Sequence, residues 1–252
     1  VVFATLSILF SPASLSHAWA LPKPASDRHA PDRTVGGILR ESLLTFRSFF
    51  MKKNIVPALL FMLLFRLPEA QLVKIINPFL LDPIAKGGLG LSTSTVGIVY
   101  GTVGIIGLTL GGILGGIAAS QGGLKRWLWP MVCAITLPDL VYVYLAYAQD
   151  SALWIANTCV FIEQFGYGFG FTAYMLYLIY FSEGEHSTSH YAISTGFMAL
   201  GMMLPGMMAG WLQELIGYRH FFLWTILCCA ATFVVCLFIK IDPEFGKKKQ
   251  QG

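Results

Sequence analysis

Long apolar runs separated by short polar stretches dominate the chain. A helix needs about 20 apolar residues to cross a hydrocarbon core of about 30 Å, and only a helix or a closed barrel satisfies its own backbone there. The runs are continuous rather than short and alternating, which excludes barrel strands. The predicted fold class is therefore all-α and polytopic. Six transmembrane helices are predicted at Ile55–Leu81, Val96–Ser120, Trp127–Ala148, Leu153–Phe181, Tyr191–Leu215 and Phe221–Ile239.

The first 53 residues divide into two predicted parts. Residues 1–20 are apolar but shorter than a span, and we expect them to be the tail of a preceding transmembrane helix. A signal peptide is the weaker alternative, because neither an initiator Met nor a basic stretch precedes the apolar residues. Residues 21–53 are predicted to form a cytoplasmic linker that ends in an amphipathic helix at Ile38–Phe50, lying along the membrane surface.

Composition supports a membrane protein and excludes other classes. Hydrophobic residues make up 56% of the 252 residues and charged residues 12%, against roughly 45–50% and about 25% in soluble domains. The net charge of +4 comes from Lys and Arg at the edges of apolar runs, so no nucleic-acid partner is predicted. All five cysteines lie inside apolar runs without C-x-x-C spacing, which indicates neither disulfides nor zinc.

The positions of the basic residues predict the orientation. Lys and Arg gather before the first helix, between the second and third helices, and in the basic tail at residues 241–252. These places share one side of the membrane, and the positive-inside rule assigns that side to the cytoplasm. Residues 54–240 are therefore predicted to form a six-helix segment of the inner (plasma) membrane with both ends cytoplasmic. The acidic connection at residues 182–190 does not follow the rule.

Glycine content repeats along the six helices. The second and fifth helices are rich in glycine, and each is the middle member of a group of three. Because three is odd, the second group enters the membrane from the opposite side, which is the inverted repeat of secondary transporters. The glycines themselves are expected to serve close helix packing.

Ionisable side chains inside a membrane helix are costly and indicate functional sites. Arg66 and Glu69 lie one turn apart near the centre of the first helix and flank Pro68. We expect the two charges to pair, and Pro68 to free a backbone carbonyl that can line a cavity. Asp139, which follows Pro138 in the third helix, has three open interpretations: a pair with Arg66, a proton carrier or a helix kink.

A second group of polar side chains lies on the fourth helix. Glu163 begins a helical stripe that includes Tyr167, Tyr174 and Tyr177, with Gln164 beside it. A carboxylate with phenols on one stripe suits a sugar or another polyhydroxylated solute, and Glu163 is the predicted proton-coupling residue. An aromatic belt at the membrane interface is an equal alternative for Tyr174 and Tyr177, and a hydrogen bond to a neighbouring helix is the alternative for Glu163.

Neither catalysis nor metal binding is predicted. No nucleophile lies beside a base, and the five histidines lie at or outside the predicted helix ends. His186 and His190 have i, i+4 spacing but lack the Glu of the H-E-x-x-H motif. We therefore expect no enzyme, no metal and no cofactor, with a proton or other cation gradient as the energy source.

The connection after the second helix carries a further motif. Its glycines and basic end resemble the gating loop of the major facilitator superfamily, although Ser120 and Gln121 replace an Asp and a basic residue of the usual pattern. Neither replacement is charged, so the loop lacks these two charges of the usual gating salt bridge. The residues that match are Gly116, Gly123, Lys125 and Arg126.

Three segments resemble the AmpG-type muropeptide permease branch of this superfamily, which also includes acetyl-coenzyme A carriers and sugar:cation symporters. They are Leu21–Asp27, Phe65–Glu69 and Phe161–Gly168. The resemblance covers essentially the whole chain and implies the C-terminal half of a transporter: six helices in two inverted three-helix repeats, with the first helix of each repeat lining the cavity.

The resemblance also implies a function and partners. We expect proton-coupled import of a saccharide or muropeptide-like solute by alternating access, in partnership with the lipid bilayer and an N-terminal half. The alternatives are uptake of acetyl-coenzyme A, export, or a non-transporting scaffold or enzyme subunit. Candidate solute-binding residues are Arg66, Glu69, Gln164, Tyr167 and Tyr174, and candidate proton-coupling residues are Glu163 and Asp139.

The predicted topology can be tested with reporter fusions. Fusions after Asp150 and after Gly252 should report opposite sides of the membrane, because an odd number of predicted helices separates the two sites. A phosphatase active only outside and a fluorescent protein active only inside would measure this. The same side for both fusions would contradict the predicted topology.

Overall fold

The computed structural model describes residues 2–20 and 34–247 of the chain. These residues form helices and connections without any strand, which confirms the all-α class. The predicted linker at residues 21–33, with its motif at Leu21–Asp27, and the last five residues of the tail lie outside the described residues.

Contacts within the chain divide it into two units, residues 1–44 and residues 45–252. The first unit contains α1 (Val2–Ala20) and most of α2 (Val35–Phe50). The last turn of α2 belongs to the second unit. The boundary therefore falls within the predicted surface helix rather than at the end of the linker.

The second unit contains all six apolar runs, and each of them is helical. Among the described residues, three helical stretches are long and apolar enough to cross a membrane: Thr93–Gly122, Leu124–Ala148 and Ser187–Phe238. The 3-10 helices are η1 and η3, and η2 is a π-helix. The elements are α3 (Ile55–Leu64), α4 (Leu67–Leu81), η1 (Ile84–Lys86), α5 (Thr93–Ile98), η2 (Val99–Gly104), α6 (Ile105–Gly122), α7 (Leu124–Thr136), η3 (Leu137–Asp139), α8 (Leu140–Ala148), α9 (Leu153–Ser182) and α10 (Ser187–Phe238).

Proline and glycine interrupt these helices where the sequence indicates. Pro68 lies in the first turn of α4, directly after the break that separates α3 from α4. Proline has no N–H and its ring clashes with the preceding turn, so it starts a helix more easily than it continues one. Gly217 has a φ of 74° and separates the two halves of α10, at the predicted connection between the fifth and sixth helices.

The break before α4 frees backbone carbonyls, and side chains of neighbouring helices bind two of them. Tyr174 on α9 donates a hydrogen bond of 2.6 Å to the Met62 carbonyl. Thr232 on α10 donates one of 2.9 Å to the Phe65 carbonyl. Side chains of two neighbouring helices therefore satisfy two of the carbonyls at this break. That a freed carbonyl lines a cavity stays a prediction.

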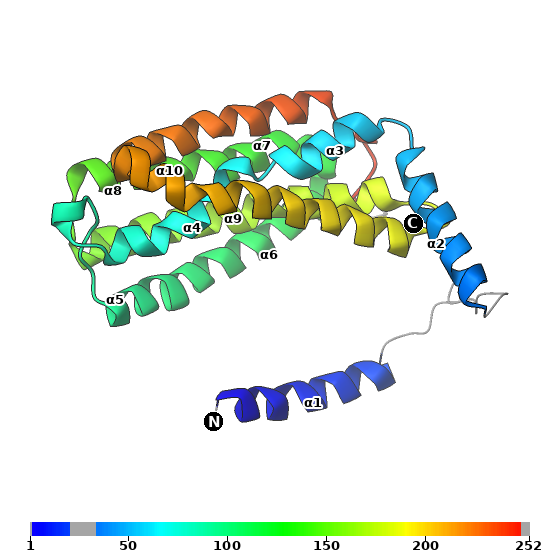
Figure 1. Ribbon diagram of the computed structural model, residues 1–252, viewed down its shortest axis with the longest axis horizontal. Coiled ribbons are helices and arrows are strands. Elements are labelled where there is room, and N and C mark those ends of the chain that lie inside the picture. The colour runs from blue at the N-terminus through cyan, green and yellow to red at the C-terminus, as the bar shows by residue number, and fades with distance from the viewer. Residues whose placement is uncertain (1, 21–33, 248–252) are drawn as a thin grey trace. The chain divides into compact units, whose positions relative to one another are not determined.

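The connections of the second unit gather at two opposite ends, on the right and left of Figure 1. At the first end, Lys52 donates to the carbonyls of Phe181 and Glu183 at 2.6 and 2.8 Å, and thereby caps the C-terminus of α9. Burial lowers the pKa of Lys52, and the nearby Glu183 partly offsets this effect. The tail joins the same end through a 3.0 Å hydrogen bond from the Leu124 amide to the Phe245 carbonyl.

The remaining connections meet at the other end. Tyr218 donates a 2.8 Å hydrogen bond to Asp82, and Arg219 donates one of 3.1 Å to the Ala146 carbonyl. Successive connections therefore alternate between the ends. This alternation is the arrangement that a chain of antiparallel helices needs.

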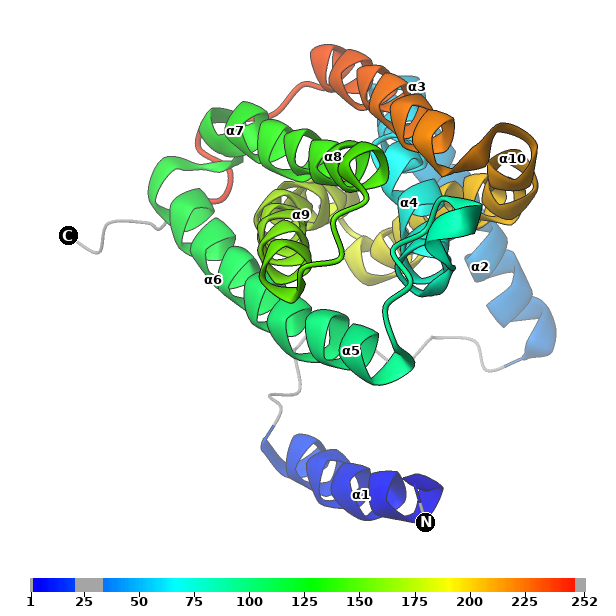
Figure 2. The same cartoon turned by 90° about the vertical axis from the view of Figure 1, so that its left-hand side faces the viewer.

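Helix α9 lies between α6 and α7 (Figure 2). Both contacts depend on glycine. A Cβ on Gly111 of α6 would overlap the Phe165 carbonyl oxygen of α9, and a Cβ on Gly166 of α9 would overlap the Ala134 carbonyl oxygen of α7. Side chains at these positions would force the backbones apart. The expected packing role is thus confirmed for Gly111, whereas Gly116, Gly196 and Gly210 have nothing within 4 Å of a Cβ.

This contact predicts a specific loss of stability. Gly111→Ala should destabilise the protein by about 1–3 kcal/mol, because the added methyl group meets backbone that cannot move away. Gly116→Ala is the matched control, because it lies on the same helix with nothing within 4 Å of a Cβ. Thermal unfolding in detergent micelles would measure both. Equal effects of the two substitutions would contradict the close contact of α6 and α9.

Candidate functional site

The carboxyl groups of Glu69, Asp139 and Glu163 meet in the interior of the second unit. One oxygen atom of each residue lies within 4.8 Å of the other two. The side chains are only 5%, 1% and 2% exposed, respectively. They come from α4, η3 and α9. We call these three residues the carboxyl cluster. The sequence predicts each residue as a candidate, but not that all three share one place.

The backbone is irregular at two of the three residues. Glu69 follows Pro68 directly after the break between α3 and α4, and Asp139 follows Pro138 in the 3-10 turn between α7 and α8. The two segments share the pattern Leu-Pro-acid. This shared tripeptide is the sequence signal that could have linked Asp139 with Glu69.

Glu163 lies in the regular helix α9 and is held by two hydrogen-bond donors. The Tyr142 hydroxyl donates to its Oε2 atom at 3.0 Å, and the Gln164 amide nitrogen lies 3.0 Å from the same atom. Gln164 also donates to the hydroxyl of Tyr100 at 3.0 Å, and Tyr100 lies in the π-helix η2. Such π-helical turns frequently occur at functional sites. The alternative for Glu163, a hydrogen bond to a neighbouring helix, is present through Tyr142 of α8.

Two oxygen atoms of the carboxyl cluster have no partner. The Oε2 atom of Glu69 and the Oδ1 atom of Asp139 are buried without a hydrogen bond from any described residue. The other Asp139 oxygen lies 3.9 Å from the Cys229 sulfur, a weak donor. A buried polar group without a partner costs about 1–3 kcal/mol, and more when it is charged. The described residues alone thus leave the cluster incompletely satisfied.

Arg66 lies near the carboxyl cluster but contacts aromatic side chains instead. It donates a hydrogen bond to the Tyr167 hydroxyl, and its guanidinium carbon lies 4.7 Å from the ring centroid of Phe171. Within the described ranges, no carboxylate lies within 4.0 Å of Arg66. The expected direct pair with Glu69 is therefore wrong, and so is the possible pair with Asp139. The two rings on α9 hold the guanidinium by hydrogen bonding and cation–π attraction.

Tyr174 and Tyr177 are packing residues in this structure. Tyr174 is fully buried, and its ring centroid lies 5.1 Å from that of Phe65. Tyr177 is also buried, with its ring centroid 4.4 Å from that of Phe61. Their burial argues against the alternative of an aromatic belt. A role of Tyr174 in solute binding stays a prediction.

The predicted gating loop contacts the tail. Gly123 has a φ of 77°, and a Cβ at this position would lie 3.2 Å from the carbonyl oxygens of Pro243 and Phe245. Lys125 and Arg126 are exposed. Gly116 is exposed on α6 and has open space around it. The gating role of these residues stays a prediction.

His186 and His190, for which no metal site is predicted, lie at the start of α10. The Nε2 atom of His190 lies 2.9 Å from the Ser48 hydroxyl. The ring centroids of the two histidines are 6.0 Å apart. His190 thus joins the last turn of α2 to the start of α10.

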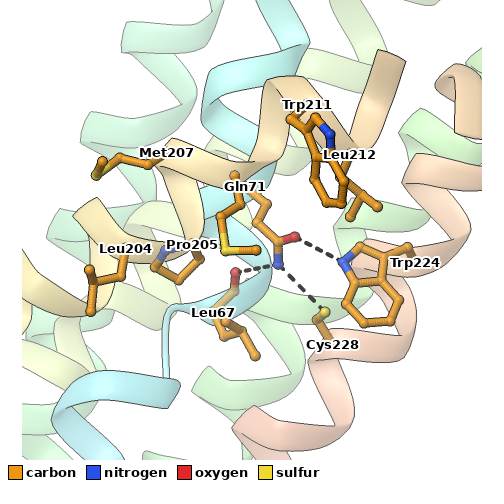
Figure 3. A pocket seen from close by; sticks show the side chains of 10 residues that line it. Leu67, Gln71, Leu204, Pro205, Met207, Trp211, Leu212, Trp224 and Cys228 are labelled. Atoms are coloured by element: carbon orange, nitrogen blue, oxygen red, sulfur yellow. Dashed lines mark hydrogen bonds between the residues drawn. The ribbon is translucent and has the colours of Figure 1, made fainter. Parts of the chain in front are cut away.

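A separate pocket of about 560 Å³ lies between α4 and both halves of α10 (Figure 3). Gln71 lies in its wall, donates to the Leu67 carbonyl at 3.1 Å and accepts a 2.9 Å hydrogen bond from the Trp224 indole. Most of the other lining residues are apolar. Gln71 is not among the residues predicted from the sequence, although a Gln two residues after Glu69 is a polar group inside a predicted membrane helix.

Comparison with known proteins gives distant relatives of one kind. No protein-family model matches the sequence. The anhydromuropeptide permease of Escherichia coli K12 is 25% identical over 201 residues, which is 80% of this chain and 40% of that permease. The provisionally named transporter AmpG 4 of Rickettsia conorii is 27% identical over 196 residues, which is 77% of this chain and 45% of that protein.

These matches confirm the resemblance to AmpG-type permeases. The chain spans less than half the length of these two relatives. Both are named as a permease or a transporter rather than as enzymes. Together with the three long apolar helices, the relatives point to a membrane protein.

The hydrogen bond to Glu163 can be tested by removing one hydroxyl. Tyr142→Phe should lower the free energy of unfolding by about 1–3 kcal/mol, because it leaves a buried carboxyl oxygen with fewer donors. Tyr144→Phe is the matched control, because Tyr144 lies on the same helix and is 52% exposed. Unfolding of both variants in the same detergent would measure the difference. Similar stabilities of the two variants would show that the contact contributes nothing.

Proposed function

We propose that this chain is one half of a secondary active transporter for a saccharide or muropeptide-like solute. Its relatives support the proposal, because they confirm its resemblance to AmpG-type permeases. The observation that carries the proposal is the carboxyl cluster. Three buried carboxyl groups in a predominantly apolar helical unit serve no packing purpose, and ionisable groups inside membrane proteins commonly mark ion or solute pathways. The name of the Escherichia coli relative suggests the class of solute.

In this proposal the second unit crosses the membrane six times. The alternation of its connections between two ends supports six antiparallel spans. Glycine-rich α6 and the glycine-rich first half of α10 would be the middle helices of two inverted three-helix repeats. Both ends would face the cytoplasm in the inner membrane, because basic residues are more numerous at the end with Lys52, Lys125 and Arg126 than at the end with Lys86 and Arg219. A second half of the transporter would complete the solute site, which alternating access opens to each side in turn.

The residues divide into two proposed roles. Glu163 and Asp139 hold the coupling ion, a proton or another cation, because their carboxyl groups share the cluster. Arg66, Gln164 and Tyr167 contact the solute. Glu69 is predicted to bind the solute, but its carboxyl group lies in the cluster. We therefore assign it to the ion as well.

Substitution of Glu163 tests this division of roles. Glu163→Gln keeps the shape of the side chain but removes its charge. In vesicles that contain this chain together with its other half, the variant should lose accumulation driven by an ion gradient by at least about tenfold. Exchange of labelled for unlabelled solute at equal concentrations should remain, because exchange needs no net ion movement.

Glu214→Gln is the control, because Glu214 lies exposed on α10, and it should retain both activities. Accumulation by the Glu163 variant would overturn the role of Glu163. Absence of solute exchange by the unsubstituted transporter would overturn the proposed function itself.

A further inference from the structure

We infer that Glu69, Asp139 and Glu163 together bind one hard metal cation of the size of Na⁺ or Ca²⁺. The bound cation would be the ion whose gradient drives uptake, and this point alone rests on the proposed function. Binding itself requires no transport and no second half of the transporter.

The ligand spacing fits a cation of this size. One oxygen of each residue lies within 4.8 Å of the other two. Calcium binds oxygen at 2.3–2.6 Å, so two ligands on opposite sides of it lie at most about 4.6–5.2 Å apart. Magnesium gives up its waters reluctantly and is seldom bound by protein ligands alone, so a buried site favours a larger cation. Na⁺ has nearly the radius of Ca²⁺. The cluster therefore suits a cation larger than Mg²⁺.

The donor atoms select a hard cation. All three side chains offer carboxyl oxygens, which suit calcium-like ions rather than zinc or copper. No histidine belongs to this group within the part of the chain that the structure describes. The Cys229 sulfur lies 3.9 Å from a carboxyl oxygen of Asp139. The same sulfur lies closer, at 3.4 Å, to the Thr225 carbonyl oxygen, to which it donates.

Two unsatisfied atoms provide independent evidence for a missing ligand. Glu69 and Asp139 are each more than nine-tenths buried, and each has a buried oxygen without a hydrogen bond from the described residues. The third carboxylate is already oriented, because Tyr142 and Gln164 both donate to Glu163. Such outer contacts typically orient the ligands of metal sites. A cation would supply the attraction that the two free oxygens lack.

Charge also favours a cation. Three carboxyl groups face one another, and Arg66, the guanidinium that acts on Glu69, is held by Tyr167 and Phe171 rather than by a carboxylate. The neighbouring polar groups from η2, α8 and α10, Tyr100, Tyr142 and Cys229, carry no positive charge. Up to three negative charges repel one another strongly in an apolar interior, and one positive charge offsets this repulsion only in part. One bound cation reduces this excess.

Thermal unfolding of the purified chain in zwitterionic lipid nanodiscs tests the inference. NaCl and CaCl₂ would be compared with MgCl₂ and with choline chloride at matched ionic strength. We expect NaCl or CaCl₂ to raise the unfolding temperature saturably by roughly 5 °C, because a ligand of the folded state stabilises it by mass action. MgCl₂ should have a smaller effect and choline chloride none.

Variants distinguish a bound ion from general salt effects. Glu69→Gln and Asp139→Asn should each raise the unfolding temperature without added metal, because they relieve repulsion, and should abolish the response to Na⁺ or Ca²⁺. Asp82→Asn is the control, because Asp82 contacts Tyr218 at one end of the unit, and it should keep the response.

No response of the unsubstituted chain, or an equal response in the cluster variants, would overturn the inference. Neither result would bear on whether the complete transporter exchanges solute. Failure of solute exchange would overturn the proposed function and leave cation binding intact.

Discussion

Mutual repulsion of buried carboxyl groups is the constraint on which the rest of this account depends. Glu69, Asp139 and Glu163 face one another in the second unit with little exposure to solvent. Like charges at such separations are tolerated only when a partner, a proton or a cation compensates them. The chain compensates Glu163 through Tyr142 and Gln164, but it leaves oxygens of the other two residues free. The described residues thus leave the cluster incompletely satisfied, and this is the observation behind the proposed cation site.

Helix packing explains how the three residues reach one place. Glycines on α6 and α9 let α9 approach α6 and α7 until their backbones touch, and this close packing fixes the position of Glu163. Proline provides the remaining geometry, because breaks at Pro68 and Pro138 interrupt two helices next to Glu69 and Asp139. Neighbouring helices satisfy two of the carbonyls near the first break. The irregular backbone is therefore supported rather than strained.

Much of the fold could be predicted from the sequence, because apolar runs, prolines and glycines act locally. The six apolar runs are helical, and Pro68 and Gly217 interrupt the chain where expected. The site was harder to predict, because contacts between helices depend on their rotation and depth. Arg66 and Glu69 are one turn apart in sequence, yet aromatic rings of α9 hold the guanidinium. The approach of Asp139 to Glu163 depends on a 3-10 turn and on packing that periodicity does not encode.

Chemical modification of the cluster tests the central claim most directly. A hydrophobic carbodiimide reacts with carboxyl groups inside apolar regions, and mass spectrometry locates the product. In membranes that contain this chain with its other half, the account predicts labelling of Glu163 that a saturating muropeptide or the coupling cation slows several-fold, while exposed Glu214 is unaffected by either. Labelling of Glu163 at the same rate with and without these ligands, in a preparation that still exchanges solute, would contradict a ligand site at the cluster.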